Sequence, residues 1–212
     1  MKLVRYSLLF FFLLFFIFWG TRYITVKEYY GDIWSHIQED VFIDDINQNL
    51  MLGSSSIKKL YSEKFLPCGA WLNRGIGGAT IEHISTYASM PFAKIYPKHI
   101  LLYSAENDIA LGIPIVQIEQ ELTNLVQALR EKYSSSKIHL IAIKPAPKRK
   151  EFHFLFSQMN KKIDTLANKH TNVFFHKPAR PFKASDFQAD GIHLSDTGYL
   201  NFIGNFQTHA CN

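Results

Sequence analysis

The 212-residue sequence is poor in cysteine, because only Cys68 and Cys211 are present. Their spacing does not match the clustered ligand pairs of a zinc site, which argues against a structural zinc of that kind. The two thiols would suit an oxidising compartment, since an even number of cysteines is compatible with a disulfide. Pairing requires Cα atoms within about 7 Å of each other, and the sequence alone leaves that distance open.

The sequence also lacks an Ala-x-Ala-like cleavage site after its long apolar run. That run, Leu8–Trp19, is dominated by Leu and Phe and follows Lys2 and Arg5. Cations before an apolar stretch are the pattern of an export signal whose N-terminus stays in the cytoplasm. The stretch is somewhat shorter than the roughly 20 residues that span a bilayer comfortably. Because no such cleavage site follows the run, we predict an N-terminal hydrophobic helix over residues 1–22, as an uncleaved signal anchor rather than a cleaved signal peptide. The remaining chain would then lie outside the cytoplasm in the cell envelope, or be secreted after cleavage.

Acidic residues are fewer than basic ones, which gives a formal net charge of +5. Most lysines are scattered, and a denser basic patch contains Lys144, Lys148, Arg149 and Lys150. This patch fits a solvated loop, or alternatively a contact with anionic lipid headgroups or an acidic polymer. Because an exported protein does not meet nucleic acid, we predict no nucleic-acid partner. The sequence does not indicate the oligomeric state.

Short apolar runs alternate with amphipathic segments after a polar and aromatic stem at residues 23–48, where Tyr29, Ile33 and Ile37 are spaced as in a short helix. Strands are predicted at Asn49–Leu52, Trp71–Asn73, His99–Tyr103, Lys137–Ile143 and Asn172–Phe175. Helices are predicted from Thr80, at Ile115–Leu129, at Phe152–Leu166 and from Ser195. Strands that alternate with helices imply crossover connections and a mostly parallel sheet covered on both faces. Residues 49–212 are therefore predicted to form an α/β domain that binds ligands at the carboxyl ends of its strands.

Three serines follow the first predicted strand in Gly53-Ser54-Ser55-Ser56-Ile57. By itself this stretch is typical of a polar turn and a helix N-cap. A serine hydroxyl becomes a nucleophile only when a base removes its proton, and a histidine oriented by a carboxylate supplies that base. Asp190-Gly191-Ile192-His193 offers such a pair in a turn before the last helix, although Asp-x-x-His also occurs by chance. Ser55, His193 and Asp190 are therefore candidates for a catalytic triad.

Ester hydrolysis also needs hydrogen-bond donors directed at the oxyanion that develops on the substrate. The glycine-rich turn Gly75–Gly78 offers backbone N–H groups without obstructing side chains, and Asn107 offers a side-chain amide. Alternatively, each of these is an ordinary structural turn. Because all of them follow predicted strands or precede the last helix, they would meet at one sheet edge, which favours the catalytic interpretation.

The order of four motifs resembles the SGNH subgroup of the GDSL esterase and lipase family. They are Gly53-Ser54-Ser55-Ser56-Ile57, Asn73-Arg74-Gly75-Ile76-Gly77-Gly78, Ala105-Glu106-Asn107-Asp108 and Asp190-Gly191-Ile192-His193. The resemblance covers roughly Asn49 to the C-terminus. It implies a flavodoxin-like three-layer α/β/α domain, with a five-stranded, mostly parallel sheet, that works without a metal or organic cofactor. It also implies that Ser55 is the nucleophile, His193 the base and Asp190 its support, while Gly78, Asn107 and the Ser55 N–H bind the oxyanion.

Two positions depart from the family pattern, since Ser54 stands in place of its aspartate and Ala105 in place of a glycine. Neither change removes a group that the chemistry requires, and the Ala105 methyl is expected to lie at the pocket wall, where it would narrow substrate choice. The expected activity is hydrolysis of a small acyl ester, such as an acetyl group on an envelope or imported carbohydrate. A lipid esterase, lysophospholipase or thioesterase is the nearest alternative, and a catalytically silent glycan-binding domain is another.

Overall fold

The computed structural model describes residues 29–43, 48–66, 69–90 and 95–207. The predicted N-terminal hydrophobic helix lies outside these ranges, as do Cys68 and Cys211. Within the described ranges, no helix combines the length and the apolar character needed to cross a bilayer.

A five-stranded, wholly parallel sheet forms the centre of the molecule. Its strands are β1 (Asn49–Gly53), β2 (Trp71–Gly75), β3 (His99–Tyr103), β4 (Lys137–Ile141) and β5 (Val173–His176). They lie in the order β2-β1-β3-β4-β5. The predicted strands and the parallel sheet are therefore confirmed. The fourth strand ends at Ile141 rather than Ile143, because the backbone N–H and C=O of Ile143 pair with the Asn160 side chain.

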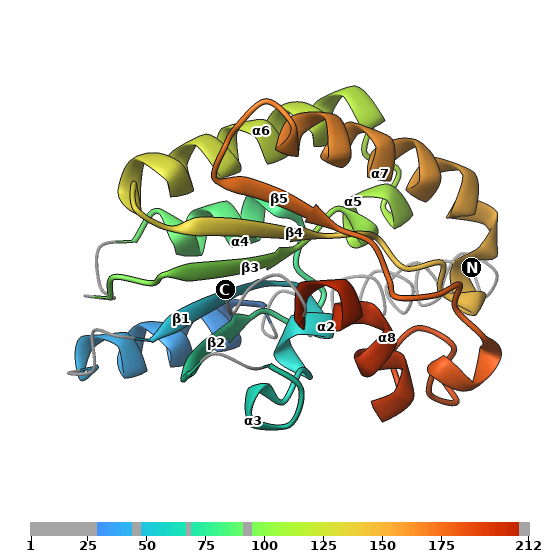
Figure 1. Cartoon of the computed structure of the whole chain (residues 1–212), viewed down its shortest axis with the longest axis horizontal. Coiled ribbons are helices and arrows are strands. Elements are labelled where there is room, and N and C mark those ends of the chain that lie inside the picture. The colour runs from blue at the N-terminus through green and yellow to red at the C-terminus, as the bar shows by residue number, and fades with distance from the viewer. Residues whose placement is uncertain (1–28, 44–47, 67–68, 91–94, 208–212) are drawn as a thin grey trace, which may run out of the picture.

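Helices cover both faces of this sheet, which confirms the predicted three-layer arrangement (Figure 1). One face carries α4 (Ile81–Ala88), α6 (Ile115–Lys132) and α7 (His153–Ala167). The other carries α2 (Ser55–Lys58), α3 (Ser62–Phe65) and α8 (Asp196–Gln207). The connections contain the short helix α5 (Glu106–Ala110) and the 3₁₀ turns η1 (Pro147–Phe152) and η2 (Ala184–Asp186).

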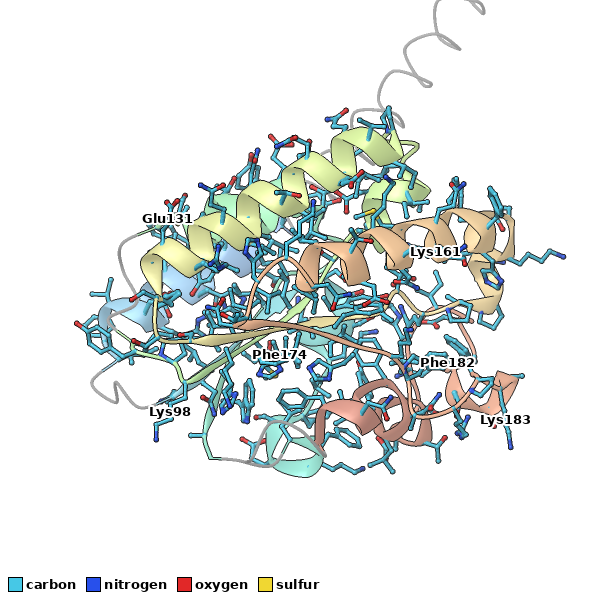
Figure 2. The ribbon with its side chains drawn as sticks, turned by 45° about the horizontal axis from the view of Figure 1, so that its top comes forward. Lys98, Glu131, Lys161, Phe174, Phe182 and Lys183 are labelled. Carbon is cyan, nitrogen blue, oxygen red and sulfur yellow. The ribbon has the colours of Figure 1, made fainter. Side chains whose placement is uncertain are left out.

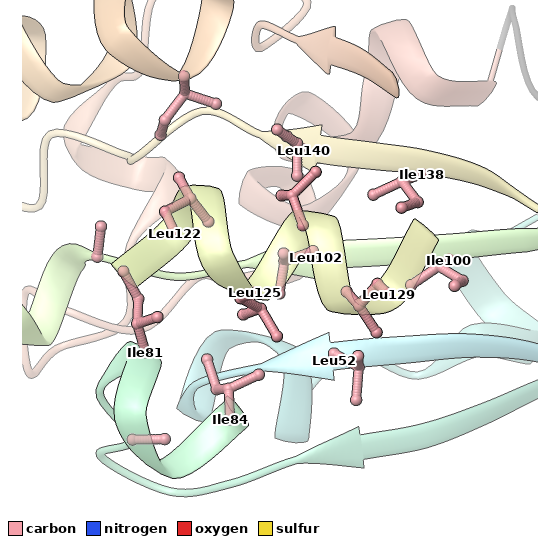
Figure 3. Packing of buried hydrophobic residues seen from close by; sticks show 14 of the residues in the cluster. Leu52, Ile81, Ile84, Ile100, Leu102, Leu122, Leu125, Leu129, Ile138 and Leu140 are labelled. Atoms are coloured by element: carbon pink, nitrogen blue, oxygen red, sulfur yellow. The ribbon is translucent and has the colours of Figure 1, made fainter. Parts of the chain in front are cut away.

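Alternation along the strands divides the buried side chains between two cores. In β3, Ile100 and Leu102 join the α6 side, while Leu101 and Tyr103 join the α8 side. This follows from the two-residue period of a strand, and both sets are apolar because both faces are covered. Figure 3 shows Leu122, Leu125 and Leu129 of α6 packed over β1, β3 and β4. The spacing of three and four residues that predicted this helix thus marks its buried side.

A helix at residues 29–41, within the segment predicted as a stem, packs on the domain. Ile33 is buried in the α6-side core. Near the helix end, Asp40 is almost fully buried, and its Oδ1 accepts hydrogen bonds from Nε and Nη2 of Arg74 at 2.9 and 2.7 Å. Its Oδ2 accepts a bond from the Tyr87 hydroxyl at 2.5 Å. The helix is therefore joined to β2 and α4 by a buried charged cluster.

Three histidines form a hydrogen-bonded row across β3, β4 and β5. His99 Nδ1 lies 3.0 Å from His139 Nε2, and His139 Nδ1 lies 2.9 Å from His176 Nε2. The central ring is buried between Phe206, in edge contact at 4.8 Å, and Phe174, stacked at 5.4 Å and labelled in Figure 2. Burial, with the neighbouring His176 and His99, lowers the pKa of His139 to about 3.

This row predicts a loss of stability in acid. Because the folded-state pKa of His139 is about 3 and the ordinary value is 6.5, the unfolded chain binds the proton first as the pH falls. The free energy of unfolding should therefore decrease from about pH 6.5 towards pH 3, by up to about 1.4 kcal/mol per pH unit from this group. Urea unfolding across that range measures the slope, and His139→Phe should reduce it. Equal slopes in the two proteins would refute the assignment to His139.

Candidate active site

The predicted site residues converge at one edge of the sheet although they come from distant parts of the sequence. Ser55 follows β1, Gly78 follows β2 and Asn107 follows β3, so that parallel strands bring all three to their shared carboxyl edge. Asp190 and His193 lie in the loop that leads into α8. The order of strands thus explains how residues that lie up to 138 positions apart meet.

Ser55, His193 and Asp190 form a continuous hydrogen-bonded chain. The Ser55 Oγ lies 3.0 Å from His193 Nε2, and His193 Nδ1 lies 2.5 Å from Asp190 Oδ2. In this arrangement the Asp190 carboxylate accepts a hydrogen bond from the Nδ1–H of His193. The Nε2 of the same ring is then unprotonated and can accept the serine proton. The spacing is therefore that of a serine nucleophile, a base and a carboxylate that orients the base.

The Asp190 carboxylate is held by its own turn. Its Oδ1 accepts the backbone N–H groups of Ile192 and His193, each at 2.9 Å. The hydrogen bond with the His193 ring, followed by the Ile192 N–H, holds the pKa of Asp190 well below its usual range. Asp190 is thus an anion near neutral pH, and it favours the Nδ1–H tautomer of His193.

Gly78 occupies the third position of a tight turn that follows β2. The Ala79 N–H donates to the Ile76 carbonyl at 3.2 Å, and Gly78 has φ of +67°. A positive φ at this position, with a negative φ at Gly77, is the signature of a type II turn and favours glycine. A Cβ at Gly78 would also approach the Tyr29 ring to 3.0 Å. Conformation and space both explain why the sequence has glycine here.

Asn107 is held at both ends of its amide. Its Nδ2 donates to the Ala79 carbonyl at 2.9 Å, and its Oδ1 accepts from Nη2 of Arg149 at 2.9 Å. Because an amide nitrogen carries two hydrogens, one Nδ2–H remains for a substrate oxygen. The bond to Ala79 places this donor next to the Gly78 turn. The two predicted oxyanion donors therefore lie together, and their catalytic roles stay predictions.

The basic patch of the sequence is not a uniformly solvated loop, and that part of the prediction is wrong. Lys144 is 1% exposed and forms a buried ion pair with Glu106. Arg149 Nη1 lies 3.2 Å from the same carboxylate, while its Nη2 holds Asn107. Burial lowers the pKa of Lys144, and Glu106 opposes that effect. Sequence reasoning missed Arg149 as a site neighbour, because the only available signal was its place in a lysine-rich segment.

The two departures from the family pattern have different surroundings. Ser54 is buried at the N-cap of α2, although its side chain makes no capping hydrogen bond. Ala105 has φ of +73° and is 1% exposed within the α6-side core. Its methyl therefore faces the core, and the expectation that it lies at the pocket wall is wrong. A left-handed alanine costs about 1 kcal/mol or more.

A groove of about 710 Å³ lies beside the carboxyl ends of β4 and β5. Lys161 of α7 and Phe182 of the segment after β5 lie on its two sides (Figure 2). Its lining contains neither Ser55 nor His193, so it is separate from the site described above. Over the ranges that the structure covers, no three His, Cys, Asp or Glu side chains are grouped to hold a metal ion.

Comparison with known proteins supports the motif order. The family model for a GDSL-like Lipase/Acylhydrolase family matches residues 54–200, which is more than half of the chain. The chain belongs to this family. It is accordingly an ester hydrolase of the GDSL type, and the predicted family is confirmed. Among curated proteins, none matches the sequence.

Solved structures of other proteins share the fold. A Streptococcus pneumonia protein, provisionally described as a platelet activating factor, superposes with a TM-score of 0.79 at 18% identity, covering 91% of this chain and 97% of its own. A GDSL-like lipase from Bacteroides thetaiotaomicron gives 0.66 at 16% identity, with coverages of 83% and 95%. A family 3 carbohydrate esterase from Clostridium thermocellum gives 0.60 at 16% identity, with coverages of 78% and 100%. At these identities the likeness concerns the fold.

Proposed function

We propose that Ser55, His193 and Asp190 are the catalytic triad of an esterase that removes a small acyl group, such as acetyl, from a carbohydrate. The observation that carries this proposal is the unbroken chain from Ser55 Oγ through the His193 ring to Asp190, with contacts of 3.0 and 2.5 Å. A glycan-binding domain without catalysis has no need of this chain, and the esterase interpretation accounts for it directly.

The reaction follows from the positions of these groups. His193 Nε2 takes the Ser55 proton while Oγ attacks the ester carbonyl, and the resulting imidazolium is stabilised by Asp190. The N–H groups of Ser55 and Gly78 and the free Nδ2–H of Asn107 receive the oxyanion, each worth roughly 3 kcal/mol in comparable enzymes. His193 then donates its proton to the leaving alcohol. In the second step His193 takes a proton from water as the water attacks the acyl-serine, and it returns that proton to Ser55 Oγ as the acid leaves.

The substrate proposal has support from the fold comparison, since the Clostridium thermocellum relative is a carbohydrate esterase. We place the enzyme in the cell envelope, joined to the membrane by residues 1–22, on the basis of the cationic and apolar pattern of that segment. Lipid esters are the second candidate because this location and the exposed Lys148 and Lys150 suit anionic headgroups. N-terminal sequencing of membrane-extracted protein tests the anchor, since a start near Tyr23 would mean cleavage.

Turnover by the purified full chain tests the function. In detergent it should hydrolyse p-nitrophenyl acetate, and a fluorophosphonate probe should label Ser55. The label should be absent from Ser55→Ala and present in Ser134→Ala, which changes an exposed serine remote from the site. Absence of both turnover and labelling in the wild type would favour the silent binding domain. A series of nitrophenyl esters separates the two substrate classes, since a preference for long acyl chains would overturn the acetylesterase proposal.

A further inference from the structure

We infer that Asp32, in the helix at residues 29–41, is a positioning residue for the two backbone donors of the oxyanion site, the N–H groups of Gly78 and Ser55. This inference rests on the proposed function. Its Oδ2 accepts the Gly77 N–H at 2.8 Å. The same carboxylate receives Lys58 Nζ at 2.7 and 2.8 Å on its two oxygens. Gly77 precedes the Gly78 donor, and Lys58 belongs to α2, which begins at Ser55. One carboxylate therefore joins the glycine turn to the helix of the nucleophile.

The Gly77 bond matters because the turn consists of residues with little intrinsic rigidity. Two consecutive glycines occupy its central positions, and glycine moves between conformations at low cost. The direction of the Gly78 N–H depends on the orientation of the peptide that joins them. Asp32 fixes the peptide before this one, while the Ala79 bond to the Ile76 carbonyl at 3.2 Å fixes the peptide after it. The donor is thus held from both sides.

Other side chains of the same helix support the turn along its length. His36 Nε2 lies 3.0 Å from the Gly75 carbonyl oxygen. The Tyr29 ring lies against Gly78 and stacks on His83 with ring centroids 4.3 Å apart. Side chains spaced three and four residues apart, from Tyr29 through Asp32 to His36, thus contact Gly78, Gly77 and Gly75 in order. This regular correspondence distinguishes a support for the glycine turn from a single surface contact.

The ion pair between Lys58 and Asp32 is partly exposed, because the two side chains are 41% and 18% accessible. Exposed ion pairs contribute little to stability, so this pair is unlike the buried Arg74 pair at the other end of the helix. A small displacement at a catalytic donor has a large kinetic effect, since about 1 Å can cost up to 10²-fold in rate. We therefore expect loss of Asp32 to affect turnover more than folding.

The test compares Asp32→Ala, Asp32→Asn and Tyr30→Ala in the full chain in detergent, with p-nitrophenyl acetate as substrate. Tyr30 is 61% exposed in the same helix and serves as the control. Asp32→Ala should lower kcat about 10- to 100-fold, less than the 10²- to 10³-fold of removing a donor outright, with KM nearly unchanged. Asp32→Asn keeps an oxygen for the Gly77 N–H and should recover most of the activity. Tyr30→Ala should match the wild type.

Two measurements separate positioning from a merely structural role. Fluorophosphonate titration counts folded active sites, so kcat is expressed per labelled serine. A boronic acid that forms a tetrahedral adduct with serine should bind Asp32→Ala more weakly by about the factor lost in kcat, because it uses the same oxyanion donors. An unchanged kcat per labelled site, or unchanged boronate affinity, would overturn the role of Asp32 alone. An inactive, unlabelled wild type would overturn the proposed function and this inference with it.

Discussion

Replacing Ser55 and His193 together is expected to slow ester hydrolysis no further than replacing either residue alone. Each single change to alanine should lower kcat/KM about 10⁴-fold or more, because the serine needs the base and the base has no other target in this step. The contact of 3.0 Å between Ser55 Oγ and His193 Nε2 makes the two side chains one functional unit. Steady-state kinetics on the single and double variants provide the comparison.

Residual activity in all three variants should be similar, since substrate binding and the oxyanion donors remain. Thermal unfolding of each variant controls for loss of the folded protein. The exposed Ser134 again supplies the matched serine control, and its alanine variant should retain the wild-type rate. If the loss of kcat/KM in the double variant equals the product of the losses in the two single variants, the two residues act independently.

The largest expected effect on stability is that of Asp40→Ala. This change leaves the Arg74 guanidinium, 3% exposed, without its buried carboxylate at 2.7 Å, and removes the acceptor of the Tyr87 hydroxyl. Removing one partner of a buried ion pair costs about 3–5 kcal/mol. The melting temperature of a domain of this size should fall by roughly 10 °C.

Glu39→Ala is the matched control because Glu39 pairs with the same guanidinium at 2.8 Å, although its own side chain is 57% exposed. An exposed partner contributes about 0–1 kcal/mol, so this neighbouring change should alter the melting temperature by only a few degrees. Urea unfolding gives the same comparison as free energies. Similar losses in the two variants would refute the role assigned to the buried carboxylate.

Strands and motifs could be predicted from the sequence because their signals are local. His99–Tyr103 is a short apolar run bounded by polar residues, and it is β3 with the same limits. Ser55, Gly78, Asn107 and the Asp190 to His193 pair follow in the order of a known family, so their convergence required only a parallel sheet. The last strand is displaced by one residue, from Asn172–Phe175 to Val173–His176, which is typical of strand ends.

The supporting charges could not be predicted, since their partners lie far away in the sequence. In the sequence Lys144 lies in a lysine-rich segment, and only the fold places Glu106, 38 residues earlier, against it. Asp32 and Gly77 are 45 residues apart, and no periodicity relates them. A charged side chain is buried only where the fold supplies a partner for it, and the composition of a segment does not reveal that partner. The resemblance to the family therefore indicated the candidate reacting groups, but it did not indicate the side chains that hold them in place.

The contacts of Tyr29 and Asp32 with the glycine turn limit how far the chain can be shortened without loss of that support. A cut before Tyr29 leaves these two contacts in place. A cut only four residues later, beyond Asp32, removes the aromatic cover of Gly78 and the carboxylate bound to Gly77. Because these contacts begin at Tyr29, we expect forms of the chain that start beyond Asp32 to hydrolyse esters more slowly than forms that start before Tyr29.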